Sequence, residues 1–275
     1  MVDMIKRSLV AIIGLPIVLI VLILGNKYVL DVIVAILAVL GIYEYMKCVG
    51  NKFKPVSWIG YLAAISIAFL HIIPQVYITT YLPLVILGIL AILFMHVVFT
   101  DMKINFADIA ISLIGIVYVV GFFAFVALLY AFEKNGQQLG KFYIAYLFLA
   151  TWGSDIFAFL VGVKFGKHKF SKISPKKSIE GCLAGTFAGV ILVIIAAIIF
   201  NNCFDLQNNY IIIGIIALII NLLGQIGDFS ASCIKRYSEV KDFSNLLPGH
   251  GGIIDRFDSV IFAAPFAYYL LTLLI

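Results

Sequence analysis

The sequence predicts an all-α protein that crosses a membrane many times. Hydrophobic residues make up 64% of the 275-residue chain and charged residues only 12%. A soluble domain is usually about half apolar and about a quarter charged, so this composition excludes a soluble globular protein. The mean hydropathy is +1.14, and long apolar runs follow one another along the whole chain. Such runs are typical of membrane helices, whereas a closed barrel would show short alternating segments.

Apolar runs of crossing length predict about nine membrane helices, because a bilayer core about 30 Å thick needs about 20 helical residues. The predicted spans are residues 8–25, 28–46, 57–74, 77–99, 108–132, 142–163, 182–200, 209–233 and 254–275. The third is short and ends at Pro74, and the last begins beside charged residues, so the count is open by one. No small-residue cleavage site follows the first run, which we therefore interpret as an uncleaved span.

The positions of the basic residues predict the orientation. With a cytoplasmic N-terminus, all but three of the 19 Lys and Arg residues fall in cytoplasmic segments, the exceptions being Lys27, Lys134 and Lys141. Cytoplasmic loops of membrane proteins carry such an excess. The sequence therefore predicts a multi-pass protein of the cell membrane with its N-terminus and its charged loops in the cytoplasm.

The first half of the chain carries little chemistry. His71 and His96 lie in apolar runs without a carboxylate at helical spacing, so we expect hydrogen-bonded core histidines rather than ligands. We assign residues 1–141 to scaffold helices and residues 142–275 to the region that carries the site, within one integral unit. No nucleic-acid-binding motif is present, and the four cysteines lack the spacing of a metal site.

Polar groups gather in two regions of the second half. In the earlier one, Asp155 lies inside the sixth span, and Lys176, Lys177 and Ser178 precede the seventh helix. Lysines beside a helix N-terminus form a phosphate site through their charge and the free backbone N–H groups. The alternative for the other lysines of this loop is attraction to anionic lipids.

The later region begins with a polar stripe on the eighth span. Its members are spaced by three or four residues, so they share one helix face: Asn221, Gln225, Asp228, Ser232 and Lys235. A structural hydrogen-bond seam between helices explains the first two. It explains poorly an acidic residue that is followed by Lys235 and Arg236, because charge inside a membrane is costly and usually functional.

A glycine-rich loop then leads to the ninth helix. It contains Gly251 and Gly252 beside His250, and it is flanked by Lys241, Asp242, Asp255, Arg256 and Asp258. Glycines allow a loop to mould closely around phosphate. Carboxylates on two helices, a basic set and such a turn together indicate Mg²⁺-dependent chemistry on a polyphosphate, with a second cation left open. One of the two aspartates that begin the ninth helix could serve only as a helix cap.

The segment Ser232–Asp258 resembles the signature of the phosphatidate cytidylyltransferases (CDP-diacylglycerol synthases) at every fixed position. The matching residues are Ser232, Ile234, Lys235, Arg236, Lys241, Asp242, Ser244, Leu247, Pro248, His250, Gly251, Gly252, Ile253, Asp255, Arg256, Phe257 and Asp258. The segment from Asp155 to Gly181 is similar to the family's other motif, with Ser178 where Thr is common.

The resemblance implies a dimeric, metal-dependent membrane enzyme of phospholipid biosynthesis. It would make CDP-diacylglycerol and pyrophosphate from CTP and phosphatidic acid. By position, Asp228 and Asp255 are the expected Mg²⁺ ligands, and with Lys235, Arg236 and Asp258 they form the expected catalytic set. The expected substrate-binding residues are Asp155, Lys176, Lys177, Ser178, Ser232, Lys241, Asp242, His250, Gly251, Gly252 and Arg256. For Asp155, Asp242 and Asp258, orientation of the basic residues is an alternative to metal binding, and for His250 a structural role in the loop is as good an interpretation as phosphate contact.

Two other functions are compatible with parts of the pattern. A related CTP-dependent enzyme could act on another lipid phosphate, such as an isoprenoid one. An ion-coupled transporter could use Asp155 and Asp228 as a cation path, but transporters often have internal repeats and polar groups near the midplane. This sequence has no repeat, and its polar groups gather at one face.

Overall fold

The computed structural model describes residues 20–22, 24–101, 103–171, 173–175, 177–204, 206–247, 249 and 251–275. Every regular element in these ranges is a helix, and β-type pairing is limited there to isolated bridges. The predicted all-α class is therefore confirmed.

Seven stretches of helix are long and apolar enough to cross a membrane within the described ranges. They are Lys27–Val49 (α2), Thr80–Phe99 within α4 (Gln75–Phe99), Phe106–Tyr130, Gly140–Phe165, Ile179–Phe204 (α9), Tyr210–Tyr237 (α10) and Ile254–Leu274 (α11). The third stretch joins α5 (Phe106–Gly115), the π-helix η2 (Ile116–Gly121) and α6 (Phe122–Tyr130); the fourth joins α7 (Gly140–Phe148), the π-helix η3 (Leu149–Gly153) and α8 (Ser154–Phe165).

The other two predicted spans differ from these seven. The first, residues 8–25, lies largely outside the described residues. The third corresponds to a shorter apolar helix, α3 (Ser57–Ser66), which continues as the 3-10 helix η1 (Ile67–Phe69). These 13 residues rise about 20 Å, less than the bilayer core. The number of crossings and the orientation of the N-terminus therefore stay predictions.

The chain divides into two compact units. Unit 1 contains the residues up to Ala127 together with Tyr237–Arg256, and unit 2 contains Leu128–Arg236 and Phe257–Ile275. This division differs from the predicted one at residue 141, because the segment Tyr237–Arg256 packs with the N-terminal helices. The predicted functional division into scaffold and site-bearing regions stays a prediction.

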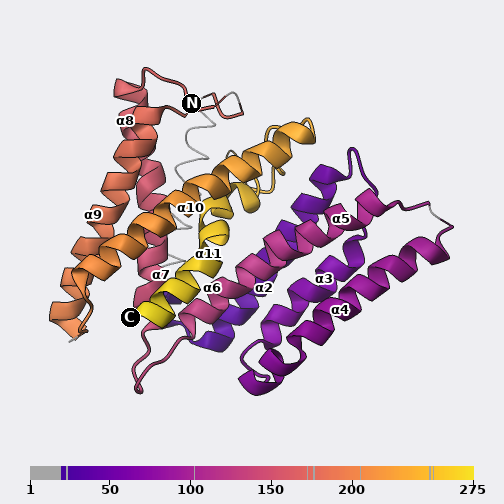
Figure 1. Ribbon diagram of the computed structural model, residues 1–275, viewed down its shortest axis with the longest axis horizontal. Helices are drawn as coiled ribbons and strands as arrows, with labels where there is room; N and C mark the ends of the chain where they lie inside the picture. The colour runs from indigo at the N-terminus through magenta and orange to yellow at the C-terminus, as the bar shows by residue number, and fades with distance from the viewer. Residues whose placement is uncertain are drawn as a thin grey trace. The chain divides into compact units, whose positions relative to one another are not determined.

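Unit 1 is organised around α2. Helices α3 and α5 pack against α2, and α4 packs against α5 (Figure 1). Tyr45 of α2 is 1% exposed, and its ring lies against Gly115 of α5. A Cβ atom at position 115 would come within 2.5 Å of the Tyr45 ring, so the close contact of the two helices requires glycine there.

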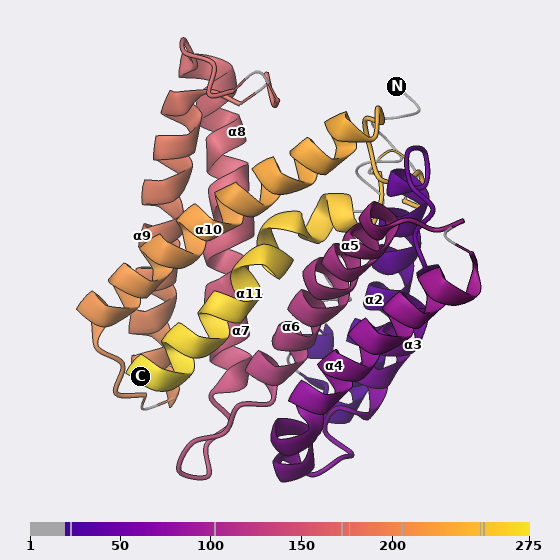
Figure 2. The same cartoon turned by 45° about the vertical axis from the view of Figure 1, so that its right-hand side comes forward.

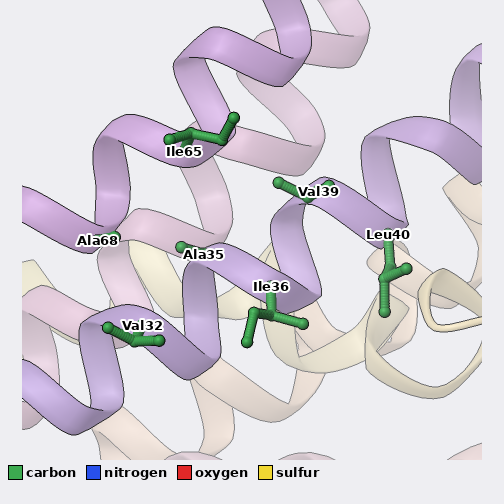
Figure 3. Close-up of a pocket in the computed structure, with 7 residues that line it drawn as sticks. All are labelled: Val32, Ala35, Ile36, Val39, Leu40, Ile65 and Ala68. Carbon is green, nitrogen blue, oxygen red and sulfur yellow. The ribbon is translucent and has the colours of Figure 1, made fainter.

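An apolar cavity of about 270 Å³ lies along α2 where α3 and η1 pack on it (Figure 3). Its lining residues are all aliphatic: Val32, Ala35, Ile36, Val39, Leu40, Ile65 and Ala68. It offers no hydrogen-bonding side chain to a nucleotide, so the polar chemistry of this protein lies elsewhere.

Unit 2 contains a pair of closely packed helices, α8 and α9, which run side by side in both views (Figures 1 and 2). Glycines allow the approach: a Cβ at Gly185 of α9 would lie 2.6 Å from the backbone oxygen of Ser154, and one at Gly181 would lie 2.6 Å from that of Ala158. Small residues at helix contacts are characteristic of membrane proteins. The π-helix η3 ends directly before Ser154 and Asp155, and such π segments often occur at functional sites.

A buried contact between an aspartate and a histidine holds the start of α2 in unit 1. Asp31 of α2 lies 2.8 Å from Nδ1 of His71 and also accepts the His71 backbone N–H at 3.1 Å. Their side chains are 0% and 6% exposed. The expectation that His71 is a hydrogen-bonded core histidine is confirmed. Its partner is 40 residues away, so spacing along one helix could not reveal it.

We expect His71→Ala to lower the free energy of unfolding by about 3 kcal/mol, because it leaves the buried Asp31 carboxylate without its imidazole partner. Thermal unfolding of the detergent-solubilised protein measures the change. His96→Ala is the matched control, since His96 lies half-exposed on α4, and we expect a much smaller effect there. Equal effects of the two substitutions would contradict a structural role for the Asp31–His71 pair.

Candidate functional site

A seam of amide hydrogen bonds connects three helical segments of unit 2. The Asn221 amide of α10 donates to the Ala150 carbonyl at 3.0 Å and accepts from the Ser154 hydroxyl at 3.2 Å. One turn later, the Gln225 amide donates to Thr186 of α9 at 2.9 Å and to Asn221 at 3.0 Å. These bonds confirm the structural seam that the sequence predicts for Asn221 and Gln225.

The loop between α8 and α9 folds back on itself over α10. The Glu180 carboxylate of α9 lies 2.6 Å from Nδ1 of His168, and it accepts the backbone N–H groups of Lys167 and His168. Further along, the Phe170 N–H donates to the Lys177 carbonyl at 2.9 Å. The Phe170 ring stacks on Phe229 of α10 with centroids 4.6 Å apart. This fold of the loop brings Lys177 to α10.

Lys177 forms an ion pair with Asp228, and its ammonium lies 4.8 Å from the centroid of the Phe229 ring. Burial tends to lower the pKa of the Lys177 ammonium, but the charge and hydrogen bond of Asp228, together with the charges of Asp155 and Asp258, raise it above the usual lysine value. Lys177 therefore stays protonated at neutral pH.

These side chains belong to a larger set, which we call the charged cluster: Asp155, Lys177, Asp228, Lys235 and Asp258. Its residues come from α8, the following loop, α10 and α11, all within unit 2. The Ser259 hydroxyl donates to Asp155 at 3.1 Å and so ties α11 to α8. Asp258 and Lys235 are only 7% and 9% exposed, and their charges act on each other. The cluster thus holds three carboxylates against two ammonium groups.

Close packing of α10 on α11 positions two of these carboxylates. A Cβ at Gly227 would lie 2.7 Å from the Asp258 carbonyl and would overlap the Phe262 side chain. The adjacent residue on α10 is Asp228. Glycine at position 227 therefore lets the helix that carries Asp228 approach the helix that carries Asp258.

The signature segment itself is divided between the two units, because the dividing points fall between Arg236 and Tyr237 and between Arg256 and Phe257. In unit 1, Oδ2 of Asp255 accepts the backbone N–H groups of Phe243 and Gly252, both at 2.9 Å. Gly251 has φ +83°, which favours glycine, and its carbonyl accepts the Leu247 N–H at 2.9 Å. Asp255 thus fastens both ends of the loop that precedes α11.

A residue for which the sequence predicts no role, Glu44, also holds this loop. Glu44 of α2 is 0% exposed and accepts the Ser244 hydroxyl at 2.6 Å. It also accepts the backbone N–H groups of Ile253 at 2.9 Å and Ile254 at 3.0 Å. The one signal in the sequence is an acidic residue within an apolar helix, which is costly and usually has a role.

The remaining predicted site residues take varied positions. Lys241, Asp242 and Arg256 are exposed, whereas Ser232 is buried. The Ser178 hydroxyl accepts the Gly181 N–H at 3.1 Å and so caps α9. Lys176 and His250 lie outside the described residues. The roles of all these residues in substrate binding stay predictions.

The donor chemistry of the charged cluster fits a divalent cation. Among the described residues, no three or more His, Cys, Asp or Glu side chains are grouped to hold a metal ion by themselves. Mg²⁺, however, is commonly bound by one or two carboxylates together with substrate phosphates. The Asp228 carboxylate, 23% exposed, already faces a cation in Lys177. Its oxygen donors therefore suit Mg²⁺.

Comparison with known proteins gives one consistent result. The family model for the cytidylyltransferase family matches residues 5–274. A phosphatidate cytidylyltransferase of Staphylococcus aureus (strain COL) is 35% identical over 271 residues, which cover 96% of this chain and 98% of that protein. One from Staphylococcus haemolyticus is 33% identical over 270 residues with the same coverage. One from Bacillus subtilis is 43% identical over 141 residues, 51% of each chain.

We expect Gly227→Ala to lower the free energy of unfolding by about 1–3 kcal/mol, because the added methyl group would collide with α11. Thermal unfolding in detergent measures the change. Gly214→Ala on the same helix is the control, since its Cβ would meet only the end of the Ile194 side chain at 3.4 Å. If both variants unfold like the wild type, the close packing of α10 on α11 at Gly227 is contradicted.

Proposed function

The chain belongs to the cytidylyltransferase family, and we propose that it transfers a cytidylyl group from CTP to phosphatidic acid, giving CDP-diacylglycerol and pyrophosphate. The relatives that match over nearly the full chain carry the name phosphatidate cytidylyltransferase. The observation in the structure that supports this function best is the charged cluster, because a buried lysine and a half-buried one beside carboxylates suit a charged phosphate substrate. The seven apolar helical stretches of crossing length among the described residues suit an enzyme whose second substrate is a membrane lipid.

In the proposed reaction, a phosphate oxygen of phosphatidic acid attacks the α-phosphorus of CTP. A new P–O–P bond forms, the bond between the α-phosphorus and the bridging oxygen breaks, and pyrophosphate leaves with the electron pair. The attacking oxygen is already anionic near neutral pH, so the reaction needs no strong general base. Catalysis then consists mainly of positioning and of charge stabilisation.

We assign the binding of the phosphates to side chains rather than to backbone N–H groups. At the start of α9, the N–H of Ile179 donates to the His168 carbonyl and that of Gly181 donates to Ser178. Before α11, the N–H groups of residues 252–254 donate to Asp255 and Glu44. This leaves Lys177 and Lys235 of the charged cluster, with Arg236, Lys241 and Arg256, as the proposed phosphate-binding groups.

We further propose that the enzyme depends on Mg²⁺, with Asp228 and Asp255 as ligands. This assignment comes from the family signature, and the carboxylate of Asp228 suits it chemically. Bound Mg²⁺ would neutralise and orient the triphosphate. Lys177, which pairs with Asp228 here, would then be free to turn its ammonium to a phosphate oxygen.

The proposed location is the cell membrane, with the site facing the cytoplasm. It is supported by the distribution of basic residues, of which all but three of 19 fall on one side under this orientation. The proposal of a homodimer is carried over from the family resemblance alone.

We expect the purified wild-type protein to release pyrophosphate from CTP only when phosphatidic acid and Mg²⁺ are present. Asp228→Asn and Asp255→Asn should each lower kcat/KM by about 100-fold or more, since each removes a negative charge required at the proposed metal site. Asp101→Asn makes the same chemical change at an exposed position with φ 49°, which Asn tolerates, and should leave the rate unchanged.

The lipid arms of this assay separate the alternatives. Release with an isoprenoid phosphate but none with phosphatidic acid would contradict the proposed lipid substrate and retain the chemistry. If the wild-type protein releases no pyrophosphate with any lipid phosphate or nucleotide, the enzymatic function is overturned. Transport would then be the function to test.

Chelation tests the proposed metal requirement separately. We expect EDTA to abolish pyrophosphate release and excess Mg²⁺ to restore it. The expected partial defect of an Asp228→Glu variant should lessen as the Mg²⁺ concentration rises, because that variant keeps a carboxylate. Full activity in EDTA, after removal of contaminating metal, would rule out the metal assignment.

A further inference from the structure

We propose that Glu44 is a positioning residue for the reaction: its carboxylate takes the place of an external anion at the N-terminus of α11 and thereby holds the loop of residues 241–254 and the first turn of that helix. This inference rests on the proposed function for its kinetic consequence. The contacts that support it lie entirely within unit 1.

The geometry of Glu44 is that of an anion bound at a helix N-terminus. The first N–H groups of a helix have no partner within it and carry the positive end of the helix dipole. Here the N–H groups of Ile253 and Ile254 both point to the Glu44 carboxylate, at 2.9 and 3.0 Å. An internal carboxylate thus fills the place that a phosphate takes at many helix N-termini.

The surroundings of Glu44 make this arrangement specific. Each of its oxygens is engaged, since Oε1 accepts from Ser244 and Ile253 and Oε2 accepts from Ile254. The carboxylate also presses against Gly252, where a Cβ would lie 2.6 Å from the Glu44 Cδ atom. Glycine at position 252 is therefore required by Glu44 itself, independently of any contact with substrate.

Glu44 affects the position of the predicted site residues through the backbone that connects them to its hydrogen-bond donors. Ile254 is the first residue of α11, and Asp255 and Arg256 follow it directly. Ser244 lies two residues after Asp242 and three after Lys241. One buried carboxylate on α2 therefore fixes both ends of the segment that carries these four residues. A helix assigned to the scaffold thus supplies a group on which the site depends.

The first test is the Glu44→Gln variant of the full-length protein in detergent. It keeps the size of the side chain but turns an NH₂ group toward one of the three donors. We expect kcat/KM for CTP to fall on the order of 100-fold, with a raised KM for CTP, because the phosphate-binding residues of the loop lose their position. A smaller fraction of folded enzyme would lower kcat alone and leave KM unchanged.

Asp108→Asn is the matched control. Asp108 is also a buried carboxylate of unit 1, 2% exposed, and it accepts the N–H groups of Lys54 and Asn105, both at 2.8 Å. It contacts no residue of the loop in these bonds. We expect this variant to lose thermal stability with KM for CTP unchanged.

Hydrogen exchange gives a readout that does not depend on turnover. In Glu44→Gln, exchange in the peptide that covers residues 243–256 should speed up by about tenfold or more, while the Asp108→Asn protein keeps the wild-type rate there. Ser244→Ala, a milder change, should give a several-fold loss of kcat/KM, because it removes one of the three bonds to the Glu44 side chain. Its effect should not add fully to that of Glu44→Gln, because both changes act on the same group of contacts.

The outcomes are distinguishable. A wild-type protein that makes no CDP-diacylglycerol overturns the proposed function. An active wild type whose Glu44→Gln variant keeps its KM for CTP, or loses activity only as Asp108→Asn does, overturns the positioning role alone. Unchanged exchange across residues 243–256 in Glu44→Gln overturns the anchoring itself.

Discussion

The cost of burying charge in an apolar protein determines where this molecule places its ionisable groups. An isolated carboxylate or ammonium away from water is strongly unfavourable, so a buried charge persists only when partners compensate it. Asp31 is compensated by His71, Glu44 by a hydroxyl and two N–H groups, and Lys177 by Asp228. Each of these contacts joins segments that are distant in the sequence. Compensation of charge therefore also ties helices to loop segments that are distant in the sequence.

The charged cluster of unit 2 uses the same physics for a different purpose. Its two lysines and three aspartates balance one another closely enough to remain within the apolar surroundings. Under the proposed function, a phosphate would replace an aspartate as the partner of Lys177, and a cation would replace Lys177 as the partner of Asp228. The close contact of Gly227 of α10 with α11 holds the backbone beside the cluster.

In unit 1, buried and partly buried hydrogen bonds hold the backbone before α11. The loop that precedes α11 is fastened by Asp255 from within and by Glu44 from α2. These bonds use backbone N–H groups that a glycine-rich loop would otherwise offer to phosphate. The sequence suggests that Gly251 and Gly252 let the loop mould around phosphate. The structure gives another physical reason for glycine at each position: Gly251 has a positive φ, and a side chain at position 252 would collide with the Glu44 carboxylate.

Composition and the length of the apolar runs determined the all-α membrane class. In lipid, a helix satisfies its backbone N–H and C=O groups by hydrogen bonds within its own segment. The helical period likewise placed Asn221, Gln225 and Asp228 on one face of α10, and the signature motif identified the family. Tertiary structure alone decided that Asp31 pairs with His71, that Lys177 reaches Asp228 and that Glu44 holds Ile253 and Ile254. These partners are separated by 40 to 210 residues, and no local pattern encodes which distant carboxylate will meet which donor. The pairing follows from how the helices pack, which is a property of the whole chain.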